Sequence, residues 1–335
     1  MAIEYPSILN FLEKTDRFEK YVNFKDNWDY SYQKLTLLNE AFEQEFGSDK
    51  TFSIVVAGSY GRMEASQQSD LDYVVLSSPE TDINIDIIVK KVRGIATNLN
   101  IVLPNETGVF AKSYTKSELI DNIGNEEDDL NKLAQRLLMI MESKPIFNEE
   151  MFNTIADEIL SKYLEYVIKE PTKEAIFLMN DLIRYFRSIA VNYQYNFWKN
   201  NEKWTIRNVK LRHSRILMYA GTLLLILNAS KLREKKFEYI KQHFRLTPFE
   251  KVVSVYLDNN DFNFSRLIGA YDIFLGKLNS SEIRKQLQVE YDDRYKNPHY
   301  AELKVTSDTF IAELTRFIFS KRGTWSEEVF EYLIF

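Results

Sequence analysis

The sequence predicts an α+β fold in two parts: a small mixed sheet with flanking helices in residues 1–147, and an all-α domain in residues 148–335. Two short apolar runs, residues 52–57 and 70–76, lie on either side of a glycine-containing turn, as strands of a buried sheet do. From residue 148 onward, glycine and proline are rare and apolar residues recur three and four positions apart, which is the helical period. A chain of 335 residues is long enough for two such domains.

The composition is that of an ordinary globular protein, with 45% apolar and 27% charged residues. Because cysteine is absent, disulfides, thiolate zinc sites and a cysteine nucleophile are excluded. A net charge of −6 argues against a broad nucleic-acid-binding surface, since such surfaces belong to basic domains. A local basic cleft is still compatible with this charge.

We expect a cytoplasmic protein that does not contact the membrane. Residues 1–20 contain acids and lack a basic leader followed by an apolar stretch, so they do not resemble a secretory signal. The longest apolar run, residues 220–227, is shorter than the roughly 20 residues that cross a bilayer.

Residues 7–47 are expected to form two or three amphipathic helices that brace the sheet. Apolar residues recur there at nearly helical spacing, most clearly Leu35, Leu38, Phe42 and Phe46. The strand of residues 52–57 follows and ends at Gly58-Ser59. A glycine turn between a strand and a helix can direct free backbone N–H groups at an anion, and phosphate is the obvious candidate.

Asp70 and Asp72 lie two positions apart in the second predicted strand, so their side chains project from the same side and Leu71 from the other. Their backbones are then roughly 7 Å apart. Carboxylates so placed can converge on cations about 3.5 to 4 Å apart, the separation in two-metal phosphoryl-transfer sites. Carboxylate oxygens suit Mg²⁺, which usually also binds substrate phosphates. The pair therefore predicts a nucleotide.

Two segments resemble the signature of the DNA polymerase β-like nucleotidyltransferase superfamily: GSYGR at residues 58–62 and SDLD at residues 69–72. Within that superfamily they look most like the N-terminal domain of bacterial PII-uridylyltransferases and their uncharacterised relatives. The resemblance implies that Gly58 and Ser59 grip a nucleoside triphosphate, with Arg62 among the nucleotide-binding residues. It also implies that Asp70 and Asp72 hold the catalytic metals.

This resemblance covers about two dozen residues, and a simpler interpretation remains open. A strand, a glycine turn and an Asp-x-Asp pair also occur in ordinary α/β proteins without catalysis. A P-loop is excluded, because the chain has no Gly-x4-Gly-Lys-Ser/Thr motif. The phosphohydrolase module that follows the transferase in PII-uridylyltransferases is missing too, since no His-Asp doublet occurs. The chain is therefore not that enzyme.

Beyond the aspartate pair, residues 85–99 show the spacing of an amphipathic helix, and residues 100–110 resemble a strand interrupted at Pro104. The superfamily resemblance implies a third carboxylate on a neighbouring strand, and Glu106 is the candidate. The alternative is an exposed glutamate in a turn. The acids of residues 126–129 precede a helix through residue 141, where they suit the helix dipole better than a metal. Helix and domain are expected to end near residues 143–145.

The helical half contains a basic stretch, because residues 203–233 include no acid. Arg207 and Lys210 are one helical turn apart, as are Arg184 and Arg187 on the preceding helix. These four side chains are candidates for contacts to the triphosphate or the acceptor. The alternative is that they form salt bridges to acids such as Asp181, Glu165 or Glu174, or lie on solvated faces.

Two further patterns in this half favour packing over function. Arg207 and His213 fit the loose Arg-x5-His spacing of a helical nuclease family, but a packed or surface histidine is the better interpretation of His213. Aromatic residues within residues 185–198 offer a platform for bases, although their helical spacing favours core packing.

Together these features predict a Mg²⁺-dependent enzyme that moves a nucleoside monophosphate from an NTP to an acceptor hydroxyl and releases pyrophosphate. The acceptor is a protein side chain, an RNA 3′ end or a small metabolite, and the resemblance leans towards a protein. The alternative is a degenerate transferase fold that binds nucleotide or a partner without turnover.

Overall fold

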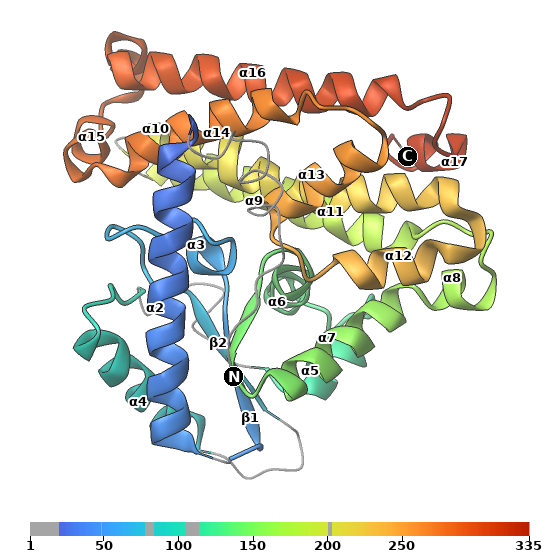
Figure 1. Cartoon of the computed structure of the whole chain (residues 1–335), viewed down its shortest axis with the longest axis horizontal. Coiled ribbons are helices and arrows are strands. Elements are labelled where there is room, and N and C mark those ends of the chain that lie inside the picture. Colours follow the sequence, from blue (N-terminus) through green and yellow to red (C-terminus); the bar gives the residue numbers. More distant parts are fainter. Residues whose placement is uncertain (1–19, 48, 78–83, 105–113, 200–202, 335) are drawn as a thin grey trace. The chain divides into compact units, whose positions relative to one another are not determined.

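The computed structural model describes residues 20–47, 49–77, 84–104, 114–199 and 203–334 (Figure 1). The chain divides into two compact units. Of the described residues, the first unit contains those between 27 and 170, and the second contains residues 20–26 and those from 171 onward. Each unit is described separately below.

One long helix, α2 (Val22–Phe46), leads into the first unit. No glycine or proline interrupts these residues, so part of the region expected to hold two or three helices is a single helix. It stops at Gly47, whose φ of +59° is the left-handed conformation that often ends helices. The amide of Asn39 donates to the Ile146 carbonyl, at 2.9 Å, and the ring of Phe46 packs on the sheet residues below.

The sheet has three antiparallel strands in the order β2-β1-β3: β1 (Phe52–Val56), β2 (Tyr73–Ser77) and β3 (Lys144–Phe147). Every residue of β1, the central strand, is buried. Two isolated parallel bridges pair Asp70 with Val102 and Ser77 with Thr115, but the described sheet itself is antiparallel and not mixed as predicted. The α+β class is confirmed, but β3 falls where only the end of a helix was expected.

The remaining helices of this unit surround the sheet. They are α3 (Gly58–Gly61), α4 (Ile85–Asn98), α5 (Lys116–Ile120), α6 (Leu130–Met141), α7 (Glu149–Tyr163) and α8 (Glu165–Lys169). The helix predicted over residues 85–99 is α4, which Asn84 caps by accepting from the Ile87 N–H. α7 contacts β1, β3, α5 and α6, so the compact unit continues past residue 147. The predicted domain boundary at 147 stays a prediction.

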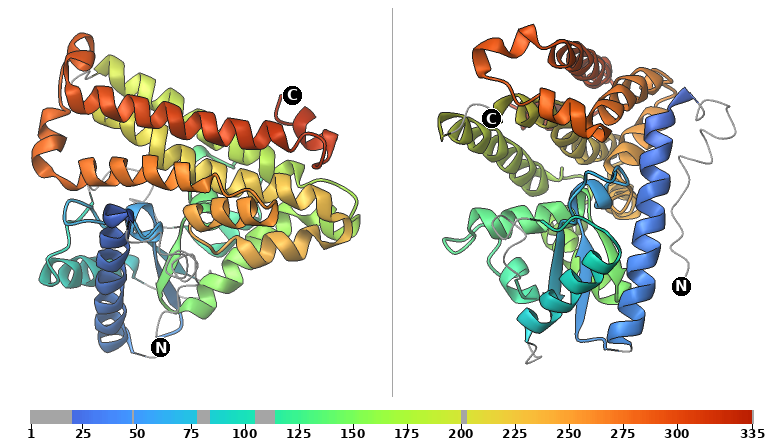
Figure 2. Two further views of the ribbon diagram at one scale, coloured as in Figure 1. Left: turned by 45° about the horizontal axis from the view of Figure 1, so that its top comes forward. Right: turned by 90° about the vertical axis from the view of Figure 1, so that its left-hand side faces the viewer.

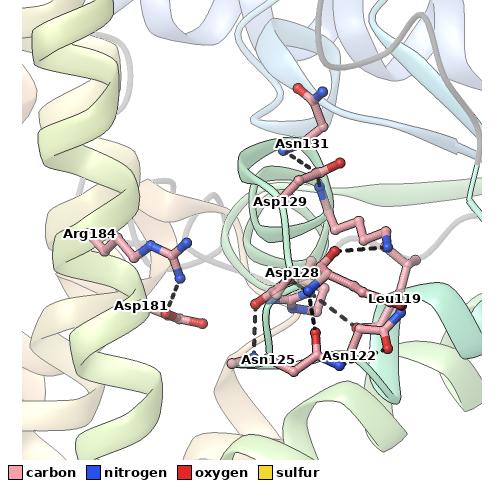
Figure 3. A network of polar contacts seen from close by, with 12 residues as sticks. Leu119, Asn122, Asn125, Asp128, Asp129, Asn131, Asp181 and Arg184 are labelled. Carbon is pink, nitrogen blue, oxygen red and sulfur yellow. Dashed lines mark hydrogen bonds and ion pairs between the residues drawn. The ribbon is translucent and has the colours of Figure 1, made fainter.

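The acids before α6 belong to the helix start. Asp129 is its N-cap and accepts from the N–H groups of Asn131 and Lys132 at 2.8 and 2.9 Å (Figure 3). Asp128 is buried and binds both terminal nitrogens of the fully buried Arg136, each at 2.7 Å. The preferred interpretation of residues 126–129 as helix-end charges is thereby confirmed for Asp129.

In the described part of the second unit, every regular element is helical (Figures 1 and 2). The elements are α9 (Ile176–Lys199), α10 (Trp204–Lys210), η3 (Leu211–Arg215), α11 (Ile216–Ala229), η4 (Ser230–Lys235), α12 (Lys236–His243), α13 (Pro248–Asp258), α14 (Phe264–Asn279), α15 (Ser281–Gln286), η5 (Tyr291–Lys296), α16 (Pro298–Ser320) and α17 (Glu327–Glu331). The predicted helical C-terminal part is confirmed.

The core of the helical unit is α11, which packs chiefly against α13. Pro248 begins α13, as predicted, and Thr247 and Glu250 form a capping box there. Pro171 does not begin a helix, since the next helix in its unit starts at Ile176. The helical stretch Trp204–His243 is long and apolar enough for a membrane span. However, 72% of its apolar 18-residue segment is buried inside the protein, as in a core helix.

Candidate functional site

The bend after β1 is shaped for glycine. Gly58 has a φ of +62°, which a residue with a side chain rarely adopts. A Cβ at this position would lie 2.4 Å from Oδ2 of Asp72 and 3.2 Å from its carboxyl carbon. The Ala57 N–H donates to the Asp72 carbonyl at 3.0 Å, so strand pairing continues to this point. The structure therefore places the Asp72 carboxylate directly against the Gly58 backbone.

Asp70 and Asp72 come just before the regular part of β2, which begins at Tyr73. Leu71 between them is fully buried and donates its N–H to the Val102 carbonyl at 2.9 Å. Asp70 is exposed and Asp72 is half-buried. This alternation agrees with the predicted placement of both carboxylates on one side, opposite the side chain of Leu71.

A buried acid that sequence reasoning missed, Glu142, holds the bend from below. Its Oε1 accepts from the Gly58 N–H at 3.0 Å, and its Oε2 accepts from Nη1 of Arg62 at 2.7 Å. The backbone carbonyl of Glu142 would lie 2.1 Å from a Cβ at Gly61, so a second glycine is required. The backbone N–H groups of this turn were expected to face an anion. The first of them, that of Gly58, instead donates to a carboxylate of the protein itself.

Arg62 belongs to the same buried group. Its Nε donates to Glu64 at 2.8 Å, and the charges of Glu64 and Glu142 both lie beside its guanidinium. Since Glu142 caps the C-terminal end of α6, where a negative charge is unfavourable, the Arg62 cation stabilises it. These contacts place Arg62 in the scaffold of the turn, and its contact to nucleotide stays a prediction.

Tyr60 and Ser59 occupy the short helix α3. Burial, chiefly, and the neighbouring Tyr30 and Asp70 raise the pKa of the Tyr60 phenol above its ordinary value. Tyr60 therefore stays protonated and neutral beside the Asp70 charge. Ser59 is half-exposed, as a residue that meets a ligand must be.

The third predicted carboxylate, Glu106, lies outside the described residues. Within the residues that the structure describes, no group of three histidines, aspartates or glutamates could hold a metal ion. The described metal candidates are therefore the two carboxylates of Asp70 and Asp72.

The four predicted cationic residues lie on α9 and α10 of the helical unit. Arg184 forms an ion pair with Asp181 at 3.5 Å (Figure 3), and Arg187 is exposed. Arg207 and Lys210 are half-buried, and Nη1 of Arg207 reaches the Asn196 carbonyl at 3.5 Å. The salt-bridge interpretation holds for Arg184. The contacts of all four to phosphate stay predictions.

His213 is a packed residue. It is fully buried in the π-helical turn η3 and stacks on Phe274 with ring centroids 4.4 Å apart and planes 5° from parallel. Its Nδ1 donates to the Val209 carbonyl at 2.9 Å. Burial lowers the pKa of His213 to about 4, so the ring is neutral near pH 7. The packing interpretation is confirmed.

The segment that contains the bend and both aspartates has a family assignment. Residues 35–146 match the family described as nucleotidyltransferase domain. This segment is a polymerase β-like nucleotidyltransferase domain. The match begins within α2 and ends within β3, so it contains β1, the Gly58 bend, the aspartate pair and Glu142. No curated protein matches the chain.

Proposed function

We propose that the protein transfers a nucleoside monophosphate from an NTP to an acceptor hydroxyl in a Mg²⁺-dependent reaction. The observation that carries this proposal is the Asp72 carboxylate against the Gly58 bend, with Asp70 two residues away, inside a nucleotidyltransferase domain. In the reaction the acceptor hydroxyl gives its proton to water as its oxygen bonds to the α-phosphorus. The bond from that phosphorus to the bridging oxygen breaks, and its electron pair leaves with pyrophosphate.

The residues of the site suit Mg²⁺, which prefers carboxylate oxygens together with phosphates. Asp70 and Asp72 would hold it, and the bound ion would supply charge for the acceptor oxygen and the leaving phosphates. Ser59, half-exposed beside the bend, donates a hydrogen bond from its hydroxyl to the β- or γ-phosphate. Glu142 and Arg62 keep the bend in place, so that these groups are oriented before substrate binds.

Arg184, Arg187, Arg207 and Lys210 enter the proposal as candidates for contacts to the triphosphate or the acceptor, since cations stabilise the charge that builds on phosphoryl oxygens. The finer resemblance to the transferase domain of PII-uridylyltransferases favours a protein side chain as acceptor. A cytoplasmic location belongs to the same proposal, because the most apolar helical stretch is mainly buried in the protein.

A second candidate function is nucleotide binding without turnover. The number of carboxylates at the site favours this candidate. The described residues provide two, those of Asp70 and Asp72, and Glu106 lies outside the described residues. A polymerase β-like site with only two acids could retain a nucleotide and lack the group that activates the acceptor.

The transfer of label from each α-³²P-labelled NTP, with Mg²⁺ and with or without cell lysate, tests the proposal. We expect labelled product from the wild type and at least about a hundredfold less from Asp70→Asn and Asp72→Asn, because each variant loses a metal ligand. Asp121→Asn is the matched control, since Asp121 is an exposed acid at the end of α5. Label that persists in both site variants contradicts the proposal, and NTP binding without any transfer supports the second candidate.

A further inference from the structure

One face of α9 is exposed along most of the helix. Five residues on it, spaced three, four, four and three positions apart, fall on a single helical stripe: Arg184, Arg187, Val191, Tyr195 and Trp198. All five are exposed. The opposite face packs into the helical unit through Leu178, Met179, Leu182 and Tyr185. We call these five residues the α9 stripe.

The second half of the α9 stripe is apolar and aromatic. Val191, Tyr195 and Trp198 are 69%, 48% and 73% exposed. A single exposed apolar side chain is normal on a protein surface, but three large ones in a row mark an interaction site. The aromatic residues of α9 were expected to pack in the core, and for Tyr195 and Trp198 that expectation is wrong.

The surroundings of the stripe in the sequence are strongly basic. Residues 182–233 contain ten lysines and arginines and one acid, Glu202, although the whole chain has a net charge of −6. Lys199 lies over the Tyr195 ring, with Nζ 4.5 Å from the ring centroid, and is itself exposed. An anionic partner complements this positive charge. The exposed aromatic rings favour a partner that also presents flat, apolar groups.

Single-stranded nucleic acid has both properties, because its phosphates pair with cations and its unpaired bases stack on aromatic rings. A duplex hides its base faces, so it offers nothing to Tyr195 and Trp198. The stripe from Arg184 to Trp198 is about 21 Å long at 1.5 Å per residue, which accommodates several nucleotides. We propose that the α9 stripe binds single-stranded nucleic acid.

This surface is local, and it fits the overall acidity of the protein. Residues 182–233 contain ten of the 43 lysines and arginines but only one of the 49 acids, so the rest of the chain is strongly acidic, repels polyanions and limits binding to the stripe. The proposal concerns binding alone and holds whether or not the nucleotidyltransferase domain transfers a nucleotide.

Anisotropy of a labelled, mixed-sequence 12-mer tests the proposal on the full chain without NTP or Mg²⁺. We expect RNA and DNA single strands to bind, the matching duplexes to bind at least tenfold more weakly, and affinity to fall as salt rises. Separate RNA and DNA arms show which strand is preferred. Quenching of Trp198 fluorescence on binding is a second readout, and it should vanish in Trp198→Ala.

Tyr195→Ala and Trp198→Ala should each weaken binding by about 5- to 150-fold, the range for loss of one base-stacking ring. Arg187→Glu should weaken it further and reduce its salt dependence. The matched controls are Phe319→Ala, an aromatic residue 65% exposed on α16, and Lys285→Glu on α15. Both controls should bind as the wild type does.

Since the substituted side chains are exposed, all variants should melt at the wild-type temperature. Equal binding by Trp198→Ala and Phe319→Ala would overturn the proposal, as would the absence of binding to either strand. A labelled polyglutamate peptide that binds as tightly as the oligonucleotides would also overturn it and would indicate an acidic protein partner.

Discussion

At the scale of single residues, the candidate site depends on contacts that leave no room for a methyl group. Gly58 combines a positive φ with a Cβ direction that points at the Asp72 carboxylate. Glu142 ties the same residue to Arg62 through its two carboxylate oxygens. A bend held by such contacts is rigid, and rigidity is what positions a carboxylate for metal binding.

Gly58→Ala should abolish most nucleotidyl transfer. The left-handed backbone conformation costs about 1 to 2 kcal/mol with a side chain present, and the new Cβ must displace the Asp72 carboxylate. Gly94→Ala is the control, since Gly94 lies in α4 with nothing within 4 Å of its Cβ position. It should keep full activity and gain up to about 1 kcal/mol of stability. Full activity of Gly58→Ala would show that the bend does not position Asp72.

Glu142→Ala should reduce the free energy of unfolding by about 3 to 5 kcal/mol, because it leaves the buried Arg62 with one carboxylate and the Gly58 N–H with none. Urea unfolding followed by circular dichroism measures this loss. Glu126→Ala removes an exposed acid and should change stability by less than about 0.5 kcal/mol. If the two variants lose the same stability, Glu142 does not hold the bend.

At the scale of elements, the helical unit is assembled around one nearly continuous helical stretch, α10-η3-α11. The π-helical turn η3 carries His213, which stacks on Phe274 of α14. A wide turn of this kind changes the helical register, so residues after it face a different direction. His213 thus joins two helices of the core as a neutral aromatic residue.

This packing predicts a loss of stability at acid pH. The pKa of His213 is about 4 in the folded protein and about 6.5 when unfolded, so between these values only the unfolded state binds the proton. The full contribution is present above pH 6.5 and is lost as pH falls towards 4. Between pH 7 and pH 5 this group alone should cost about 2 kcal/mol.

Urea unfolding at several pH values checks this expectation against His213→Phe, which keeps the ring stack and lacks the titratable group. The variant should lose less stability than the wild type between pH 7 and pH 5, by the same about 2 kcal/mol. Identical pH profiles for the two proteins would contradict the assignment of a neutral buried imidazole.

At the scale of the whole molecule, the charge is distributed unevenly along the chain. A net charge of −6 coexists with ten cations and one acid in residues 182–233. The nucleotidyltransferase match ends at residue 146, before this stretch begins. The basic stretch therefore belongs to the helical unit and lies outside the matched segment. The α9 stripe exposes part of this stretch on the surface.

The sequence predicted the features that depend on near neighbours in the chain. The strand after residue 52, the helix over residues 85–98 and the start of α13 at Pro248 all follow from local period and capping. The family resemblance also implied that the bend and the aspartate pair share one site, and the antiparallel pairing of β1 with β2 brings these segments together. β3 was missed because four residues, one of them proline, have too short a pattern.

By itself, the sequence determined the α+β class, the glycine bend and the alternation of Asp70, Leu71 and Asp72, because each is set by backbone periodicity over a few residues. Only the tertiary structure decided that Glu142, 84 positions from Gly58, binds the bend, and that Tyr195 and Trp198 are exposed on α9. Those outcomes depend on what packs opposite each side chain. A helical period places residues on one face, but it does not say whether another element covers that face.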